Sequence, residues 1–548
     1  MRPWGRNRQG RRPVIEQEEQ LVLYIRNRMR EYLESGVPRG IPVREREKYR
    51  GQIQQLRNAL HCCMYGAGGE KEYVKHVIFR MLEEMELTTW EREALFPLGS
   101  PGRLSAKQKF AVLLFSYMKK YGEDGFMKLC ERWNLPGEVQ REDGLYYEIT
   151  AEDIHGIYKK EQLLPTGREQ LELICDMVYE GFGHGVIDRL RDCRLDGISG
   201  GVAGVPEQFF CYEKELLGAY VGQHAYDSIF VMLHGNTVRL SFLSFGSAGE
   251  LRRVVKALLR FESPGDLSCS RPYMVTDMKD GSRVFACRPP FSESWAFFVR
   301  KFDSAREKSP RELIVGDGAK ELIEALILFV GSGLHIAITG AQGSGKTTLL
   351  KALVRFINPK YNLRIEESVF ELWMRREFPY RNILTFRETE VVDAMEGLDA
   401  FRKTDGNCLM MGEIGTIQAA ALMIELSQVS EQQLFTHHAM TSEKLIGYFK
   451  NALLRTGAYS DEEMAKEQVI EAIDIHILCE KDINGKRYIR EIAEIVSGGE
   501  EVRVLFQYNP EENRYEKKQA PSEGLRYKMG RQRDGKGAEE FRKLFTEV

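Results

Sequence analysis

The residues with the clearest chemistry are Gly340 to Thr347, which read Gly-Ala-Gln-Gly-Ser-Gly-Lys-Thr. They fit the Gly-x-x-x-x-Gly-Lys-Thr pattern of a phosphate-binding loop. Glycines let such a backbone curl until several N–H groups point at one anion, and the positive end of the next helix strengthens that field. Lys346 is expected to reach the β- and γ-phosphates, and the Thr347 hydroxyl to ligate Mg²⁺. The predicted nucleotide site comprises Gly340, Ala341, Gln342, Gly343, Ser344, Gly345, Lys346, Thr347 and Thr348.

The flanks of this loop favour the phosphate-binding interpretation over a glycine-rich turn with a stray lysine. Leu334 to Thr339 is a short apolar run suited to a buried parallel strand. After the loop, apolar residues recur at helical spacing from Leu349 to Ile357, and Asn358-Pro359 should end the helix. The pattern therefore stands between a strand and a helix, as the chemistry requires.

Three later apolar runs are predicted to be strands that end in acids or histidines. Leu363 to Ile365 leads to Glu366-Glu367, Cys408 to Met411 to Gly412-Glu413, and Gln433 to Thr436 to His437-His438. In a parallel sheet these ends lie on the same edge as the phosphate loop. Although a strand can end in an acid by chance, a glutamate at position 413 can polarise the attacking water or hold the water shell of Mg²⁺.

Composition narrows the class of protein. The 548 residues are 43% hydrophobic and 29% charged, with a formal net charge of −3, so we expect several domains with solvated surfaces. The ten cysteines include no Cys-x-x-Cys pair, which argues against a structural zinc site and fits a reducing cytosol. The apolar run from Ala325 to Ala341 is broken by Gly331-Ser332-Gly333, so a buried helix and strand explain it better than a membrane span. We expect a soluble protein.

Periodicity divides the chain into four regions. Residues 1–165 are predicted to be mostly helical, behind an arginine-rich tail that we interpret as solvated rather than as a lipid or nucleic-acid contact. Residues 166–303 mix helix with two predicted hairpins, around residues 234–236 and 279–282. Residues 304–508 alternate helices with apolar strands, which predicts an α/β sheet covered by helices, and include a third hairpin around residues 482–485. Residues 509–548 are predicted to be a polar tail with at most one helix, near residues 538–545.

Taken in order, these motifs resemble those of the secretion and pilus-assembly ATPase superfamily, and specifically its CpaF-like branch (Tad/Flp pilus). The four motifs of that superfamily correspond here to the phosphate loop, an Asp box at Ile365-Glu366-Glu367, a Walker B strand at Leu409 to Glu413 and a His box at Leu434 to Ala439. Met278 to Val284 and Phe298 to Phe302 resemble the signatures that end the N-terminal domain of the family. The likeness covers roughly residues 168–497.

The resemblance implies a RecA-like P-loop NTPase domain preceded by a smaller α+β N-terminal domain and a helical N-terminal extension. It further implies a ring, usually a hexamer, that binds ATP and Mg²⁺ between the two domains. Glu413 would be the catalytic acid and Glu366 would assist in the nucleotide site. His438 would sense the phosphate, and Arg283 and Arg300 would reach the γ-phosphate, although surface ion pairs are an equal alternative for each arginine.

The chain departs from the family pattern at several positions. Glu367 stands where the family has aspartate, Gly415 where it has arginine, and Met440 where it has asparagine. His437 takes the place of an isoleucine, which predicts a strand residue rather than a second sensor, and the arginine-rich run before Walker B is thinned to Arg402 and Lys403. These changes leave nucleotide binding intact but bear on the rate of turnover.

Three functions remain open on this basis. The first is an ATPase motor of a type IV or Tad-like pilus, or of a type II/IV secretion system, docked on an inner-membrane platform protein from the cytoplasmic side. The second is a nucleotide-gated scaffold with weak or no hydrolysis. The third, a nucleic-acid translocase, is ranked last because the sequence has no basic stripe interleaved with aromatic residues.

Overall fold

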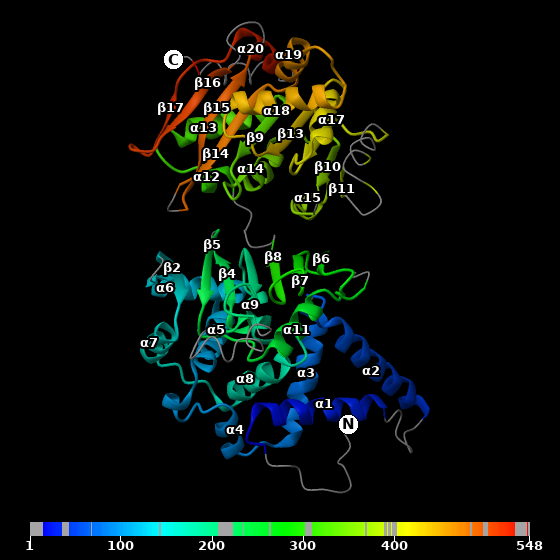
Figure 1. Cartoon of the computed structure of the whole chain (residues 1–548), viewed down its shortest axis with the longest axis vertical. Helices are drawn as coiled ribbons and strands as arrows, with labels where there is room; N and C mark the ends of the chain where they lie inside the picture. Colours follow the sequence, from blue (N-terminus) through cyan, green and yellow to red (C-terminus); the bar gives the residue numbers. More distant parts are fainter. Residues whose placement is uncertain are drawn as a thin grey trace. The chain divides into compact units, whose positions relative to one another are not determined.

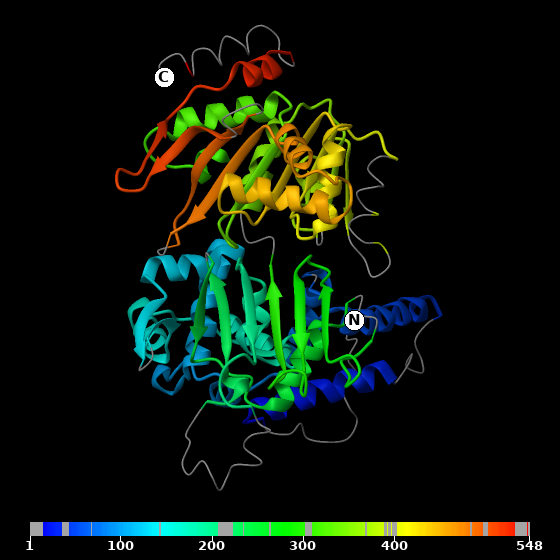
Figure 2. The same ribbon diagram turned by 45° about the horizontal axis from the view of Figure 1, so that its top comes forward.

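The computed structural model describes residues 15–34, 43–66, 68–141, 144–206, 223–233, 235–261, 265–301, 309–367, 370–387, 392, 396, 403–482, 485–496, 502–531 and 545. The chain forms two compact units, Met1–Ser304 and Ala305–Val548, which Figures 1 and 2 show from two directions. The predicted basic tail at the N-terminus, Arg402 and most of the predicted helix near residues 538–545 lie outside the described residues.

The first unit begins with the helices that its apolar periodicity predicts. Four of its later helices start at a capping box in which a threonine or serine and the third residue of the helix satisfy each other's N–H groups (Thr88, Ser105, Thr150 and Thr166). The α-helices are α1 (Glu18–Glu34), α2 (Val43–Cys62), α3 (Gly68–Met85), α4 (Thr89–Leu95), α5 (Ala106–Tyr121), α6 (Gly125–Trp133), α7 (Ala151–Glu161), α8 (Gly167–Glu180), α9 (Asp188–Arg191) and α11 (Ala248–Leu258).

The described strands of this unit form a sheet in the order β1-β2-β5-β4-β3-β8-β7-β6. Both predicted hairpins are confirmed, since β4 pairs with β5 and β6 with β7 in antiparallel register. Apolar residues on one face of the sheet, such as Met274, Val284 and Val299, belong to the core beneath it. The strands are β1 (Gly137–Arg141), β2 (Gly144–Ile149), β3 (Gly197–Gly200), β4 (Ile229–Leu233), β5 (Asn236–Leu240), β6 (Tyr273–Asp277), β7 (Arg283–Cys287) and β8 (Ala296–Arg300).

Two features of this unit were not predicted from the sequence. Residues 1–165 are mostly helical but also contain the hairpin β1–β2, which joins the sheet through a parallel pairing of β2 with β5. They also share one hydrophobic core with residues 166–299, so no separate core ends near residue 165. The segment 197–204 is rich in glycine, yet it contains the strand β3, whose backbone pairs with β4 and β8.

The second unit contains a sheet in the order β11-β10-β12-β13-β9-β14-β15-β16-β17. The six strands β11, β10, β12, β13, β9 and β14 run parallel to one another. The strands β15, β16 and β17 extend the sheet with antiparallel pairings, and the pairing of β14 with β15 confirms the third predicted hairpin. The strands are β9 (Ile336–Gly340), β10 (Leu363–Glu367), β11 (Ile383–Arg387), β12 (Cys408–Met411), β13 (Gln432–His437), β14 (Ile475–Lys481), β15 (Arg487–Ile495), β16 (Val502–Asn509) and β17 (Arg514–Lys517).

Helices cover both faces of this sheet, so the unit has three layers (Figure 1). The core on one face joins the sheet to α13 (Ala319–Gly331) and α14 (Lys346–Leu353), and the core on the other joins it to α17 (Ile417–Ser427), α18 (Ser442–Arg455) and α19 (Glu462–Ala472). One strand, β13, separates the phosphate-loop strand β9 from β12. That inserted strand distinguishes the RecA-like order, and the predicted fold class is confirmed.

The C-terminal segment also differs from the expectation. Within the predicted polar tail of residues 509–548, β17 completes the sheet and a helix, α20, occupies Glu523–Arg531. Phe545 is buried and its ring packs on that of Phe506, so this position is attached to the core of the second unit. Among the described residues, no helix has the length and apolar character needed to cross a membrane.

Candidate nucleotide-binding site

The phosphate loop connects β9 to α14, in the strand–loop–helix context that the sequence predicts. Gly340 has a φ of 141°, and a Cβ there would lie 2.1 Å from the carbonyl oxygen of Cys479 on the neighbouring strand β14. Gly343 and Gly345 have φ values of 76° and 95°, which L-residues with side chains rarely adopt. The loop therefore needs glycine at these positions. Lys346, Thr347 and Thr348 form the first turn of α14, where backbone N–H groups lack acceptors within the helix.

Lys346 lies within this loop and has no ion-pair partner within 4 Å among the described residues. Its Nζ donates to the carbonyl oxygens of Gly340 and Ala341, each at 3.0 Å, and to Nδ1 of His438 at 3.3 Å. Burial lowers the pKa of Lys346, and the Glu413 carboxylate partly offsets that effect. An ammonium in this setting gains most from an incoming anion, because its hydrogen-bond partners among the described residues are two carbonyl oxygens and an imidazole nitrogen.

His438 joins Lys346 to Glu413. Its Nε2 lies 3.0 Å from Oε1 of Glu413, and because Lys346 donates to Nδ1, the Nε2–H donates to the carboxylate. The side chains of His438 and Glu413 are 41% and 54% exposed, so this end of the chain of contacts opens to solvent. The structure thus brings together three of the predicted functional residues, one each from α14 and from the ends of β12 and β13.

Backbone contacts fix the ends of these strands. Gly412 N donates to the carbonyl of Glu366 at 2.9 Å, which ties the residue before Glu413 to β10. Ile414 N donates to the carbonyl of Thr436 at 2.9 Å, and the ring of His437 contacts the Ile414 carbonyl through Nδ1 at 2.9 Å. Burial lowers the pKa of His437, and its ring packs on Tyr448. His437 is a strand residue, as the sequence predicts.

The two acids of the predicted Asp box have different surroundings. Both Glu366 and Glu367 are buried at the end of β10. Oε1 of Glu367 accepts from the backbone N–H groups of Glu371 and Leu372 at 3.0 and 2.9 Å, which orders the segment after the strand. Burial raises the pKa of Glu367 to about 7 in spite of these hydrogen bonds. Glu367 therefore has a local structural role, which leaves Glu366 as the acid of the predicted site.

Arg283 and Arg300 lie in the first unit, where the structure places them beside each other. Arg283 begins β7 and Arg300 ends β8, and the antiparallel register makes them directly opposed partners. Asp277 of β6 opposes Arg283 on its other side, so one acid and two arginines occupy neighbouring positions across three strands. Among the described residues, no carboxylate lies within 4 Å of the guanidinium of Arg283, so the surface ion pair considered for it is not formed there.

Two residues near the loop escape sequence analysis. Arg487, the first residue of β15, donates from Nε to the carbonyl of Gly343 at 2.8 Å. His476 of β14 lies between two hydroxyls, with Nε2 at 2.6 Å from Thr339 Oγ1 and Nδ1 at 2.7 Å from Ser442 Oγ. Burial lowers the pKa of His476 to about 4, so it is neutral and ties β9 to the start of α18. The two residues lie on the two strands of the predicted hairpin, but only the sheet order places them beside the loop.

The loop fits a triphosphate with Mg²⁺. The Thr347 hydroxyl is half-buried in the first turn of α14, and the buried Oγ of Ser344 has no hydrogen-bond partner among the described residues. No preformed group of three or more His, Cys, Asp or Glu side chains in the described part of the chain could hold a metal ion by itself. Such a site suits an ion that arrives with the phosphates and keeps several of its waters.

Comparison with known proteins finds two distant relatives. No model of a protein family matches the chain. A protein of Methanocaldococcus jannaschii, the uncharacterized protein MJ0900, is 23% identical over 270 residues, which is 45% of this chain and 46% of that protein. The conjugal transfer protein TrbB of Rhizobium radiobacter is 25% identical over 231 residues, or 41% of this chain and 68% of TrbB. The match thus spans about half of the first relative and two thirds of the second.

Among the solved structures that resemble the chain are two ATPases and a pilus retraction motor. The ATPase DotB of Legionella pneumophila is 14% identical, with 64% of this chain and 83% of DotB covered and a TM-score of 0.39. The VirB11 ATPase of the Brucella suis type IV secretion system is 18% identical, with 55% and 89% covered and a TM-score of 0.29. The pilus retraction motor PilT is 13% identical, with 58% and 81% covered and a TM-score of 0.37. Because these likenesses are weak, the fold class rests on the strand order.

Proposed function

We propose that this chain is an ATP-hydrolysing motor of the secretion and pilus-assembly type. The observation that carries the proposal is the contact series Lys346–His438–Glu413, which joins the phosphate loop to the ends of two parallel strands. A loop that binds phosphate and an acid that can act on water are the groups that phosphoryl transfer to water needs.

The proposed mechanism assigns one task to each group. The first-turn N–H groups of α14 and the Lys346 ammonium bind the β- and γ-phosphates, and the ammonium exchanges its loop carbonyls for phosphate oxygens. Thr347 would hold Mg²⁺, which would neutralise phosphate charge. Glu413 orients and polarises the attacking water, and it would also help to hold the water shell of the metal. His438 holds the Glu413 carboxylate in place and senses the γ-phosphate through its contact with Lys346.

Glu366 and the two arginines complete the proposed site. Glu366 supports the Gly412–Glu413 backbone through its carbonyl and adds a carboxylate near the strand ends. Arg283 and Arg300 reach the γ-phosphate of a bound nucleotide, where guanidinium groups stabilise charge that builds on the phosphoryl oxygens.

Steady-state hydrolysis of ATP by the purified chain tests the proposal, with Lys346→Ala and Glu413→Gln as paired controls. We expect turnover that both substitutions abolish, with ATP binding lost in Lys346→Ala and retained in Glu413→Gln. Turnover that survives both substitutions would assign the activity to a contaminant and contradict the proposal.

The cellular role is proposed more broadly. The resemblance to the CpaF-like branch and the similarity to TrbB favour a pilus or a type II/IV secretion system, in which a ring of subunits, a hexamer in the usual case, works on an inner-membrane platform protein from the cytoplasmic side. Cross-linking in membranes would identify the partner protein and thereby the branch of the family, the direction of work and the transported substrate.

A nucleotide-gated scaffold is the second candidate. One specific observation favours it: Glu367, in place of the usual aspartate, is buried with a pKa raised to about 7 by burial and orders its own loop. Tight ATP binding without turnover by the wild-type chain, in the presence of Mg²⁺, would decide for the scaffold. Stimulation of hydrolysis by single-stranded DNA at low salt would instead favour a translocase.

A further inference from the structure

The phosphate loop touches the hairpin β14–β15 at its start and at its centre. A Cβ at Gly340 would lie 2.1 Å from the carbonyl oxygen of Cys479 on β14. Arg487, the first residue of β15, donates from Nε to the carbonyl of Gly343 at 2.8 Å, and its Cδ would lie 3.4 Å from a Cβ at Gly345. A change in the backbone of the loop therefore acts directly on Arg487.

Lys486, the residue before Arg487, connects this hairpin to the turn between β16 and β17. Its Nζ donates to the hydroxyl oxygen of Tyr508 at 2.7 Å and to Oδ1 of Asn513 at 2.8 Å. The Tyr508 hydroxyl donates to the same Oδ1 at 2.7 Å, and Tyr508 is buried. Because Lys486 and Arg487 are consecutive, this triangle of hydrogen bonds holds the backbone from which Arg487 reaches the loop.

The turn between β16 and β17 also holds the segment through which the chain enters the second unit. That unit begins at Ala305, and residues 314–318, here called the entry segment, lead into α13. Asp317 N donates to the carbonyl of Asn513 at 3.2 Å, and the carbonyl of Asp317 accepts from Tyr515 N at 2.8 Å. These bonds form a parallel bridge to β17, the last strand in the order of the sheet (Figure 1).

Two glycines of the entry segment allow its backbone to lie directly against that of the turn. Gly316 has a φ of 133°, and a Cβ there would lie 2.7 Å from the carbonyl oxygen of Asn513. Gly318 has a φ of 72°, and a Cβ there would lie 2.3 Å from the carbonyl oxygen of Tyr515. No side chain fits at these distances, so a shift of the turn displaces the entry segment as well.

We propose that these contacts couple the phosphate loop to the entry segment, along the path Gly343, Arg487, Lys486, Asn513 and Asp317. Phosphate binds to N–H groups of such a loop, so its binding constrains the carbonyls between them, including that of Gly343. Arg487 follows this carbonyl, and the rest of the path carries the constraint to the entry segment. Arg487, Lys486 and Asn513 are positioning residues in this scheme.

The inference rests on the proposed function and deepens it, because it gives a nucleotide at the phosphate loop a route to the segment that follows the first unit in the chain. Coupling between two sites is reciprocal, so a change at the entry segment must also alter the affinity of the loop for nucleotide. Each link consists of one or a few hydrogen bonds, and the expected effect on affinity is therefore severalfold.

Gly318→Ala in the full-length chain is the first test. Gly457 has a similar φ of 75° but no heavy atom within 4 Å of an added Cβ, so Gly457→Ala is the matched control. We expect Gly318→Ala to raise the Kd for a non-hydrolysable ATP analogue with Mg²⁺ by about three- to tenfold, and Gly457→Ala to keep the wild-type value. A Kd in Gly318→Ala that is not raised, or an equal rise in Gly457→Ala, would overturn the inference.

A double-mutant cycle shows whether the effect passes through Arg487. Arg487→Gln removes the contact with the Gly343 carbonyl, so adding Gly318→Ala to this variant should leave its Kd unchanged. If Gly318→Ala raises Kd by the same factor in both backgrounds, the effect takes another route and the inference fails.

A milder variant keeps the test decisive if Gly318→Ala fails to fold, as judged by thermal unfolding. Lys486→Met removes the bonds to Tyr508 and Asn513 from an exposed position and leaves the backbone unchanged. It should raise Kd about two- to fivefold, with no further effect in Arg487→Gln. Lys320→Met, which removes a lysine whose side chain is 83% exposed on α13, is the control for lost charge. Wild-type affinity in Lys486→Met, or an equal loss in Lys320→Met, would contradict the inference.

Hydrogen exchange separates this inference from the proposed motor. Saturating analogue should slow exchange of the amides of Asp317 and Tyr515 about threefold or more in wild type, and this change should be lost in Arg487→Gln. If the wild-type chain hydrolyses ATP without this change, the proposed function stands and the inference fails. If the change occurs without hydrolysis, the motor fails and the coupling stands. A wild-type chain that does not bind the analogue would contradict both.

Discussion

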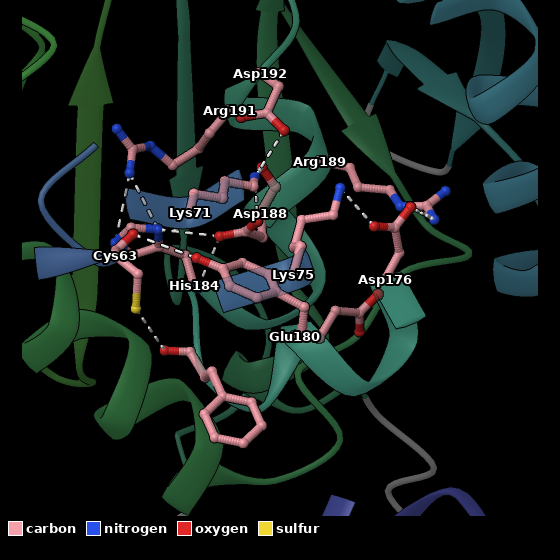
Figure 3. Close-up of polar contacts among 12 residues, drawn as sticks. Cys63, Lys71, Lys75, Asp176, Glu180, His184, Asp188, Arg189, Arg191 and Asp192 are labelled. Atoms are coloured by element: carbon pink, nitrogen blue, oxygen red, sulfur yellow. Dashed lines mark hydrogen bonds and ion pairs between the residues drawn. The ribbon is translucent and has the colours of Figure 1, made fainter. Parts of the chain in front are cut away.

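Two buried lysines of this chain have opposite surroundings. Lys71 of the first unit lies between Asp188 and Asp192, with the Asp192 oxygen at 2.7 Å, in a cluster that also pairs Lys75 and Arg189 with Asp176 (Figure 3). Lys346 of the second unit contacts two carbonyls and one imidazole. Burial alone would lower the pKa of Lys71, but its two carboxylate partners outweigh burial and raise it, whereas burial prevails at Lys346 and lowers its pKa.

This difference distinguishes a lysine that stabilises the fold from a lysine that is available to bind an anion. Lys71 has its counter-ions inside the fold, so its removal would leave buried carboxylates without compensation. Lys346 has no carboxylate within 4 Å among the described residues, so we expect its removal to destabilise the fold little and to deprive the site of its principal cation. Both positions hold a buried lysine, and the two roles differ because carboxylates contact Lys71 whereas carbonyl oxygens and an imidazole contact Lys346.

Lys346→Met should have the largest effect, and this effect should be on ATP turnover rather than on the stability of the fold. We expect turnover of ATP to fall about 10²- to 10³-fold or more, because the phosphates lose their main electrostatic partner. The unfolding temperature without nucleotide should stay within a few degrees of wild type. A large loss of stability in this variant would break the distinction between the two lysines.

Lys71→Met should give the reverse result. The free energy of unfolding of the first unit should fall by about 3–5 kcal/mol, because Asp188 remains buried without its cation. Chemical denaturation measures this change, and nucleotide binding by the folded fraction should keep its wild-type Kd. An unchanged denaturation midpoint would show that the buried cluster tolerates the loss and that our assignment of Lys71 is wrong.

His476 is a third buried titratable group, and it should make the stability of the second unit depend on pH. Burial lowers its folded-state pKa to about 4, against 6.5 when unfolded, so between these values the unfolded chain binds the extra proton. Stability supplied by neutral His476 is complete above pH 6.5 and falls as the pH drops toward 4, by about 1.4 kcal/mol per pH unit. His476→Gln should be less stable at pH 7 and should lose this part of the slope in denaturation measured from pH 7 to 4.5. A slope equal to that of wild type would contradict the assignment.

Arg487→Gln should have the smallest effect. Its Nε donates to the Gly343 carbonyl of the phosphate loop from β15. Loss of one partly exposed hydrogen bond should weaken ATP binding severalfold, which corresponds to about 1 kcal/mol, and leave kcat nearly unchanged. Isothermal titration with the ATP analogue measures it. A loss as large as that of Lys346→Met would mean that Arg487 is itself a main phosphate ligand.

Much of the second unit could be predicted from sequence because its signals are local. The phosphate loop, the strand Cys408–Met411 and the ends of β10 and β13 follow from short apolar runs and the residues after them. The sheet order then brings Lys346, His438 and Glu413 together, as parallel strands should.

What could not be predicted depends on contacts between distant segments. The sequence of β3 is rich in glycine and lacks an apolar pattern, so it favours a loop. The segment is a strand because its backbone pairs with β4 and β8, which come from distant parts of the chain. Gly318 gives no local signal of its role, since the carbonyl that it accommodates belongs to Tyr515, far along the chain. The contact of His476 with two hydroxyls likewise needs the order of β14 and β9 and the start of α18.

Equilibrium binding of an ATP analogue with Mg²⁺ tests the central claim most directly, namely that Lys346 awaits a nucleotide phosphate. Wild type and Glu413→Gln should bind with similar Kd, Lys346→Met at least tenfold more weakly, and Lys71→Met like wild type. Wild-type affinity in Lys346→Met, or no binding by the wild-type chain, would contradict the account.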